Sequence, residues 1–183
     1  MEQVESVPDI ARSQDKLFEE VLATYGDALE RLACAYEAEP ETRCDLLQEI
    51  HIGLWRSLDG FDNRCSLRTW VYRVAHNTAA SHVTRQVRMK KRTLVGLEEL
   101  AELPDRAEGE DAAGRRHSLH RLLELVRKLE PLDRQVMLAY LEGMDAASTA
   151  EITGLSARNV ATRIYRVKNV LARRFREGGR DEQ

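Results

Sequence analysis

Two amphipathic helical patterns, separated by a short polar loop, lie between Asp45 and Ala79 and constrain the fold more than any other segment of the chain. In both patterns, apolar residues recur every three or four positions, which is the period of an α-helix that buries one stripe. The stripes consist of Leu46, Leu47, Ile50, Leu54, Trp55 and Leu58 before the loop and Leu67, Trp70, Val71, Val74 and Thr78 after it. We therefore expect two long helices, each with one buried face and one polar face.

The same helical period covers most of the remaining chain. A strand-rich fold would need alternating runs rich in Val, Ile and Thr, and the sequence contains none. With 43% hydrophobic residues and only 10 Gly and 4 Pro, the chain can bury helical cores with few interruptions. The predicted fold class is all-α, and the residues expected to be buried near the C-terminus include Leu119, Val136, Tyr140 and Leu141.

Charge is unevenly distributed along the chain, although the net charge is only −3. Acidic residues gather in 98–111, whereas Arg and Lys gather in 85–92 and 158–176. This asymmetry is typical of a nucleic-acid-binding protein with an acidic tether. We expect two small helical domains joined by a flexible acidic linker. The predicted segments are a disordered tail at 1–14, an N-terminal helical bundle at 15–92, the linker at 93–116, a C-terminal helix-turn-helix domain at 117–177 and a tail at 178–183.

The C-terminal segment contains a short helix, a Gly154-Leu155-Ser156 turn and a long helix, which together predict a helix-turn-helix. Gly154 tolerates the left-handed backbone of the turn, and Ser156 can cap the second helix. Arg158 and Asn159 open that helix and suit base edges in the major groove. Arg163, Arg166 and Lys168 suit phosphates. The other interpretation is a basic, solvated face on an ordinary helical bundle.

The helix before the polar loop carries Asp45, Gln48 and Glu49 on one face, because they are spaced three and four residues apart. Acidic and amide groups on such a ridge suit docking onto an Arg-rich partner. A charged outer face is also the default for any amphipathic helix.

The loop and the helix after it combine basic, amide and aromatic side chains, which can hold a phosphate backbone and accept unstacked bases. These are Arg64, Arg68, Arg73, Asn77 and Arg85, with Trp70 and Tyr72 close by. Trp70 itself belongs to the apolar stripe and is expected in the hydrophobic core. His76 and His82 are expected to be exposed.

Several functional classes lack support in the sequence. Cys34, Cys44 and Cys65 form no C-x-x-C pair, and no His spacing completes a metal site, so we expect structural thiols with redox sensing as the lesser alternative. No nucleophile–base pair or Gly-rich phosphate loop suggests an enzyme or a cofactor. No signal peptide or membrane-spanning run is visible, which predicts a cytoplasmic protein without membrane insertion.

Two sequence blocks together resemble the bacterial extracytoplasmic-function sigma factors. The first holds D-L-L-Q-E from Asp45, L-W at Leu54, a loop that begins with Phe61, and T-W-V-Y-R-V-A-H-N-T-A from Thr69. The second holds L-E-P-L-D-R-Q-V-M-L-A-Y-L-E-G from Leu129, the helix-turn-helix, and R-I-Y-R-V-K from Arg163. The resemblance covers about residues 15–92 and 117–176.

The resemblance implies a sigma factor that binds core RNA polymerase, directs it to promoters and assists promoter melting. Sigma domain 2 would be 15–92 and sigma domain 4 would be 117–177. The implied partners are the clamp helices and the flap of the large polymerase subunits, promoter DNA and an anti-sigma factor. The implied site residues are Asp45, Gln48 and Glu49 for core polymerase; Asp62, Asn63, Arg64, Cys65, Ser66, Arg73 and Asn77 for the minus-ten element; and Ser156, Arg158, Asn159, Thr162, Arg163 and Arg166 for the minus-thirty-five element.

The sequence departs from the family in the loop, where Asp62-Asn63 replaces a more usual basic residue and glycine, and at Ala146 and Ala161. The promoter sequence therefore does not follow from the resemblance. Two other interpretations stay open: an autonomous helix-turn-helix regulator with an N-terminal sensor or dimerisation domain, and a helical adaptor that does not bind DNA.

Overall fold

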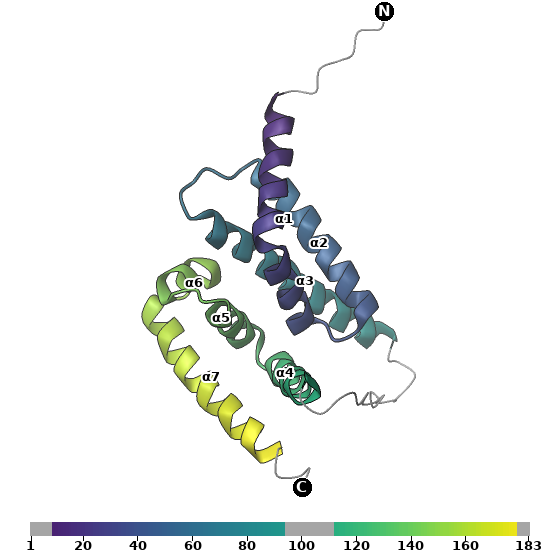
Figure 1. The fold of residues 1–183 in the computed structure, drawn as a ribbon, viewed down its shortest axis with the longest axis vertical. Helices are drawn as coiled ribbons and strands as arrows, with labels where there is room; N and C mark the ends of the chain where they lie inside the picture. The colour runs from purple at the N-terminus through teal and green to yellow at the C-terminus, as the bar shows by residue number, and fades with distance from the viewer. Residues whose placement is uncertain (1–8, 94–111, 179–183) are drawn as a thin grey trace, which may run out of the picture.

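The computed structural model describes residues 9–93 and 112–178, and within them it contains helices and no strand. The helices are α1 (Asp9–Tyr36), α2 (Pro40–Leu58), α3 (Leu67–Thr93), α4 (Ala112–Arg127), α5 (Pro131–Leu141), α6 (Ala146–Thr153) and α7 (Ala157–Gly178). The all-α prediction is confirmed. Figure 1 shows α1, α2 and α3 in one half of the molecule and α4 to α7 in the other.

Helix ends differ from the sequence prediction in the segments expected to be tail and linker. Helix α1 begins at Asp9 within the expected tail, α3 continues to Thr93 at the start of the expected linker, and α4 begins at Ala112 within that linker. Contacts with α2 anchor the first turns of α1, because Gln14 Nε2 donates to the Trp55 carbonyl at 2.6 Å. The remaining parts of the predicted tails and linker, 1–8, 94–111 and 179–183, lie outside the described residues.

The N-terminal half is built on a core shared by α1, α2 and α3. Its fully buried side chains include Val21, Leu29, Leu46, Ile50, Leu54 and Val71. Helices α2 and α3 approach closely at Gly53, where an added Cβ would lie 3.2 Å from Thr78 Oγ1. The small residue therefore sets the spacing between the helix of the predicted docking ridge and the helix of the predicted DNA face.

The C-terminal half contains the predicted helix-turn-helix. Asp145 caps α6 by accepting from the Ser148 amide at 2.7 Å, and Gly154 ends it in the left-handed region at φ 72°. Ile152 and Val160 are buried between α6 and α7. Thr149 is a polar residue in an apolar position and is fully buried. Its hydroxyl is satisfied there, because it donates to the Asp145 carbonyl at 2.8 Å.

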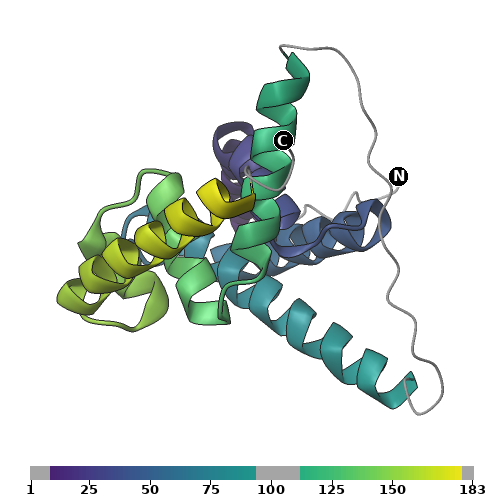
Figure 2. The same cartoon turned by 90° about the horizontal axis from the view of Figure 1, so that it is seen from below.

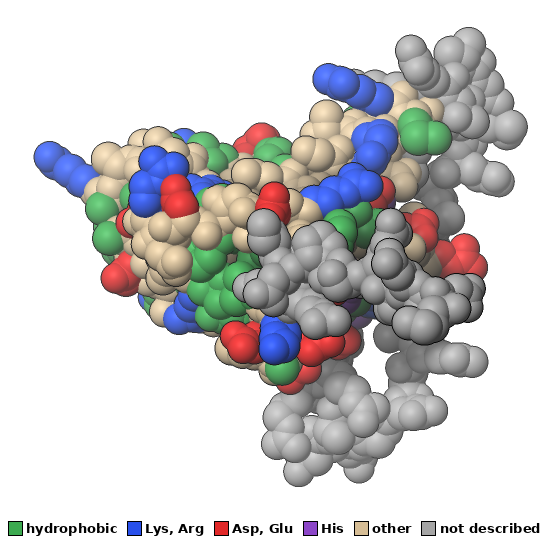
Figure 3. Space-filling view, turned by 90° about the horizontal axis from the view of Figure 1, so that it is seen from above, with side chains coloured by type: hydrophobic (Ala, Val, Ile, Leu, Met, Phe, Trp, Pro, Cys, Tyr) green, Lys and Arg blue, Asp and Glu red, His purple; other side chains and the backbone are tan. Residues whose placement is uncertain are grey.

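The two halves pack against each other. Helix α6 lies against α3, α4 lies against α1, and one continuous cluster of buried apolar side chains draws residues from both halves. In Figure 2 the C-terminal part of α3 projects away from this contact, at the opposite side from α7. In Figure 3, Lys and Arg side chains line the part of the molecule that extends to the upper right.

Several burial predictions are wrong. Trp55, Leu119, Tyr140 and Leu141 are more than a third exposed, although the helical period placed them on buried stripes. The position of Trp55 at the rim of the bundle lets its indole N–H donate to Asp15 Oδ1 at 3.0 Å. In the opposite direction, Tyr72, His76 and His82 are buried rather than exposed, since neighbouring helices cover that face of α3.

Candidate partner and nucleic-acid interfaces

The docking ridge, defined as Asp45, Gln48 and Glu49, lies on the outer face of α2. Asp45 and Gln48 are exposed, and neither side chain forms a hydrogen bond or an ion pair with the described residues. Glu49 is only partly exposed, and its Oε2 accepts from Arg85 Nη2 of α3 at 2.6 Å. The ridge therefore presents one free carboxylate and one that already has a cationic partner.

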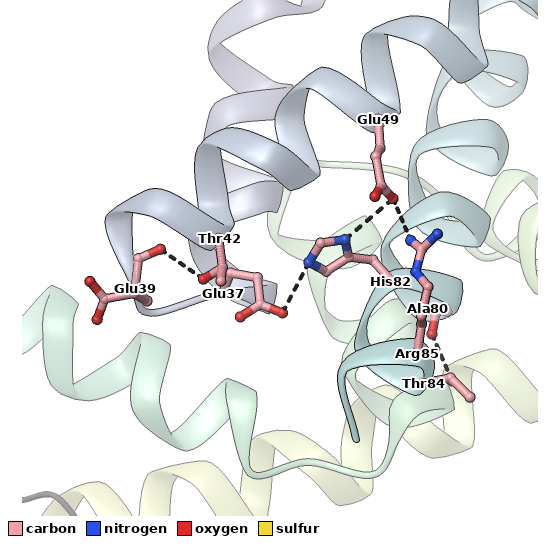
Figure 4. Close-up of polar contacts among 8 residues, drawn as sticks. All are labelled: Glu37, Glu39, Thr42, Glu49, Ala80, His82, Thr84 and Arg85. Carbon is pink, nitrogen blue, oxygen red and sulfur yellow. Dashed lines mark hydrogen bonds and ion pairs between the residues drawn. The ribbon is translucent and has the colours of Figure 1, made fainter. Parts of the chain in front are cut away.

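A buried histidine stands behind Glu49. His82 Nδ1 lies 3.3 Å from Glu49 Oε2, and His82 Nε2 lies 3.7 Å from Oε1 of Glu37, the residue after α1, as Figure 4 shows. Both carboxylates are within ion-pair distance, although neither ring nitrogen makes a hydrogen bond of good geometry. His82 of α3 thus lies between α2 and the segment that follows α1, at the base of the ridge.

The capture loop, defined as residues 62–66, has an internally ordered backbone. Asn63 adopts φ 61°, a left-handed conformation that Asn tolerates better than most residues after Gly. Asp62 accepts from the Arg64 amide at 3.2 Å and from Arg64 Nε at 2.5 Å. The backbone hydrogen bond is the main reason that the pKa of Asp62 is lowered. Ser66 begins α3 by accepting from the Thr69 amide at 3.0 Å.

A pocket of about 360 Å³ lies beside the capture loop. It is lined by Asp62, Arg64, Cys65, Trp70 and Arg73 of the N-terminal half and by Glu151 of α6. The Arg73 guanidinium stacks 4.8 Å above the Trp70 ring, whose indole N–H donates to Ser57 Oγ at 3.1 Å. The loop pocket thus combines two guanidiniums with an aromatic wall, a combination suited to a nucleotide.

The predicted minus-ten residues are only partly brought together. Four of them, Asp62, Arg64, Cys65 and Arg73, line the loop pocket, whereas Asn63, Ser66 and Asn77 are exposed outside its lining.

Two side chains expected on the DNA face of α3 instead contact the C-terminal half. Tyr72 is 2% exposed, and its hydroxyl donates to Glu142 Oε2 at 3.2 Å. Arg68 donates to the Glu142 backbone carbonyl. Burial raises the pKa of Tyr72 to about 12, with the Glu142 charge as a further cause.

His76 faces the interior of the bundle. Its Nδ1 lies 3.1 Å from the Tyr36 hydroxyl, and the ring is completely buried. Desolvation lowers the pKa of His76 to about 3, so the ring is neutral at physiological pH. The ring is therefore part of the hydrophobic core and has no access to DNA in this structure.

The first turns of α7 present most of the predicted minus-thirty-five residues to solvent. Ser156, Arg158, Asn159, Thr162 and Arg166 are exposed. Ser156 Oγ also caps the helix by accepting from the Asn159 amide at 3.3 Å. Within the described part of the chain, the Arg158 guanidinium has no hydrogen-bond or ion-pair partner, which suits a residue that reaches a base edge.

Arg163 and Arg166 share an acidic partner that sequence reasoning missed. Asp133 of α5, only 7% exposed, accepts from Arg163 Nη1 at 2.5 Å and from Arg166 Nη2 at 2.7 Å. Asp133 lies in the polar start of α5, beside Arg134 and Gln135, so the sequence gave no sign that its carboxylate would be buried. Glu142 and Glu151 were also missed, and their isolated positions along the sequence gave no signal either.

The cysteines of the protein are unpaired. Cys34, Cys44 and Cys65 are free thiols, and Cys34 Sγ accepts from Arg43 Nη1 at 3.4 Å. Across 9–93 and 112–178, no group of three or more His, Cys, Asp or Glu side chains could hold a metal ion. In the same residues, no helix has the length and apolar character needed to cross a membrane.

Comparison with known families gives two matches in the expected order. The model of sigma-70 region 2 matches residues 21–89, and the model of sigma-70 region 4 matches residues 119–171. Together the two models cover more than half of the chain. The first match contains the docking ridge and the loop pocket, and the second contains the helix-turn-helix.

Similar proteins, matched over most of their length, support the same assignment. The chain is 28% identical to the RNA polymerase sigma factor CnrH of Cupriavidus metallidurans, over 88% of each chain. It is 25% identical to the RNA polymerase sigma factor NccH of Alcaligenes xylosoxydans xylosoxydans over 86% of each chain, and 25% identical to the ECF RNA polymerase sigma-E factor of Haemophilus influenzae over 90% of each.

Two solved structures share the fold. CnrH in complex with the cytosolic domain of CnrY has a TM-score of 0.63 at 22% identity, covering 89% of this chain and 92% of the other. The sigma factor RpoE in complex with the anti-sigma factor NepR, from Bartonella quintana, has a TM-score of 0.65 at 22% identity, covering 85% and 94%.

Proposed function

The chain belongs to the extracytoplasmic-function class of the sigma-70 family, and on this premise we propose how its surfaces divide the work of transcription initiation. The protein binds core RNA polymerase, directs it to specific promoters and assists melting of the duplex. It acts by binding, without catalysis of its own, in the cytoplasm. The observation that carries this proposal is the presence of both sigma-70 regions, in order, with an exposed ridge in the first and an exposed recognition helix in the second.

The docking ridge is the proposed contact with the clamp helices of the largest polymerase subunit. Asp45 and Gln48 offer an exposed carboxylate and amide on one face of α2, which suits Arg-rich helices. Glu49 joins this surface through a carboxylate that Arg85 already pairs. Asp45 is therefore the residue whose removal isolates the docking role most cleanly.

The loop pocket is the proposed site for an unstacked base of the minus-ten element, within a functional unit spanning 15–92. The pocket's guanidiniums favour the phosphate backbone, and Trp70 offers an aromatic surface. We propose that all of the predicted residues contact the minus-ten element: Asp62, Asn63, Arg64, Cys65, Ser66, Arg73 and Asn77.

The second proposed unit, 117–177, follows a proposed linker at 93–116 and reads the minus-thirty-five element. The exposed start of α7 supports a helix in the major groove. Control by an anti-sigma factor is also proposed, since the relatives of known structure were solved in complexes with CnrY and with the anti-sigma factor NepR.

Reconstitution with purified core RNA polymerase tests the function. The wild-type chain should direct run-off transcripts from a subset of genomic promoters, and Asp45→Lys should remove them while the far-ultraviolet circular dichroism spectrum stays unchanged. Glu20→Lys, a charge reversal on the exposed face of α1, is the matched control and should retain transcription.

An absence of core-dependent initiation on every promoter would contradict the sigma assignment. Tight duplex binding without polymerase, combined with that absence, would favour the autonomous helix-turn-helix regulator instead.

A further inference from the structure

The Glu49 carboxylate of the docking ridge is held through one of its two oxygens. Arg85 Nη2 of α3 donates to Glu49 Oε2 at 2.6 Å, and His82 Nδ1, three residues earlier on the same helix, lies 3.3 Å from that same oxygen. Among the described residues, the other oxygen, Oε1, has no hydrogen-bond or ion-pair partner. One oxygen of Glu49 is therefore tied to α3, and the other is available to a partner.

His82 and Arg85 differ in how a partner can affect their contacts with Glu49. The Arg85 side chain is 56% exposed, so a guanidinium of a docking protein can take its place. The His82 side chain is only 3% exposed. A protein that docks on the ridge therefore competes with Arg85 but does not contact the His82 ring, and the contact between His82 and Glu49 persists in the complex.

The His82 ring is itself fixed from its opposite edge. His82 Nε2 lies 3.7 Å from Glu37 Oε1, and the Glu37 amide donates to the Ala33 carbonyl at 2.9 Å, which continues the last turn of α1. Figure 4 shows the ring between the Glu37 and Glu49 carboxylates. A flip of the ring would place carbon atoms against both carboxylates, so these two contacts together define one ring orientation.

Neither ring nitrogen completes a hydrogen bond, although both are buried. Buried polar atoms are costly unless a neighbouring group compensates them, so such a ring calls for an explanation. The two carboxylates supply the compensation by electrostatic attraction at short range. The attraction to Glu49 requires a proton on Nδ1, which the imidazolium and one of the two neutral tautomers carry.

We propose that His82 is a positioning residue for polymerase binding, whose buried ring holds Glu49 Oε2 from inside the helical bundle and so orients the carboxylate toward a cationic side chain of the core enzyme. This inference rests on the proposed role of the docking ridge. His82 makes no contact with polymerase. It acts by ordering the Glu49 side chain in advance, so that less rotamer freedom is lost when the complex forms.

Three substitutions of His82 separate this role from simple packing. His82→Asn places a side-chain N–H near the position of Nδ1, which faces Glu49. His82→Gln places its N–H near the position of Nε2, which faces Glu37. His82→Leu fills the space without any donor. Circular dichroism and urea denaturation show whether each variant is folded, and equilibrium binding to labelled core RNA polymerase measures the effect.

His82→Leu should weaken binding to core polymerase by about threefold to tenfold, the range expected when one ordered side chain becomes free in the unbound protein. His82→Asn should keep most of the wild-type affinity, whereas His82→Gln should resemble His82→Leu. A histidine that only fills space would be replaced equally well, or equally badly, by the two amides.

A double-mutant cycle provides the second readout. Because His82 acts through Glu49, His82→Leu should cause no further loss of affinity in a Glu49→Ala background. Asp45→Ala is the matched comparison, since Asp45 belongs to the same ridge but forms no ion pair with His82. The losses caused by Asp45→Ala and His82→Leu should therefore add.

Wild-type affinity in His82→Leu, equal affinities of the Asn and Gln variants, or additive losses from His82→Leu and Glu49→Ala would each overturn the positioning role. In these cases Asp45→Ala and Glu49→Ala would still weaken binding if the ridge docks on polymerase. Wild-type affinity in both Asp45→Ala and Glu49→Ala would overturn the docking ridge and the positioning role together, so the two failures are distinguishable.

Discussion

The carboxylate of Asp133 on α5 lies 2.5 Å from the guanidinium of Arg163 on α7. Its second oxygen lies 2.7 Å from Arg166, so one buried acid holds two arginines of the proposed DNA-reading helix. These two ion pairs fix how α7 is oriented on α5. It also reduces the positive charge that these two residues offer to a phosphate.

Asp133→Asn should therefore separate stability from DNA affinity. Leaving Arg163 without its buried partner should lower the free energy of unfolding by about 1–3 kcal/mol. The two released guanidiniums should strengthen binding to duplex DNA of any sequence and steepen its dependence on salt. Urea denaturation and binding titrations at several salt concentrations measure both effects. Unchanged stability and an unchanged salt slope would show that the pair matters little in solution.

Arg158 and Asn159 should carry sequence discrimination. Alanine at either position should cost about 1–3 kcal/mol on the preferred minus-thirty-five sequence and little on an unrelated one, because a base contact is lost. Arg166→Ala is the comparison, since loss of a phosphate contact weakens all sequences alike. Competition binding with the two duplexes distinguishes these patterns. Equal loss on both duplexes for Arg158→Ala would assign that residue to the phosphate backbone.

Arg85 should compete with polymerase for Glu49. Arg85→Gln frees the Glu49 carboxylate and should tighten binding to core polymerase by a small factor, because a partly exposed ion pair contributes only about 0.2–1 kcal/mol. Arg88→Gln, a neighbouring exposed change on α3, is the matched control. Equilibrium binding of labelled core polymerase gives the affinities. Weaker binding in Arg85→Gln alone would mean that the pair docks as a unit.

His76 should make the fold sensitive to acid. Its pKa falls from 6.5 in the unfolded chain to about 3 in the folded protein, so between these values the unfolded chain binds the additional proton. The stability that His76 contributes is complete above pH 6.5 and is lost as the pH falls toward 3, by at most about 1.4 kcal/mol per pH unit.

His76→Phe should therefore flatten the pH dependence of the free energy of unfolding over this range. Tyr36→Phe removes only the hydrogen bond between the two side chains and should retain the wild-type slope. Denaturant unfolding at a series of pH values supplies the comparison. Parallel profiles for His76→Phe and the wild type would show that the ring becomes solvated before the protein unfolds.

Local signals predicted the helices well, because each one depends on residues close in sequence. The apolar period located α2 and α7, and Gly154 ended α6 as expected. The apolar period could not show whether a residue at the edge of a buried stripe would be covered by a neighbouring helix. Trp55 and Tyr140 turned outward, and His76 turned inward, because the neighbouring helix that covers or leaves each position is distant in sequence.

The sequence predicted which residues belong to each candidate site, but it did not predict which charged side chains pair with them. The ridge and the loop could be located from spacing and residue type alone. The partners that alter them come from other helices: Arg85 at Glu49, Asp133 at Arg163, and Glu151 at the loop pocket. The sequence around a carboxylate on a helix does not show which guanidinium of another helix will pair with it.

Both tryptophans of the chain lie in the N-terminal half, one on the helix that carries the docking ridge and one in the loop pocket. Trp55 is 43% exposed on α2, the helix of the docking ridge, and Trp70 forms a wall of the loop pocket under Arg73. The natural protein therefore contains its own optical reporters. Selective excitation of indole, with Trp55→Phe and Trp70→Phe to separate the two signals, allows the arrival of polymerase and of DNA to be timed independently, without attaching a dye.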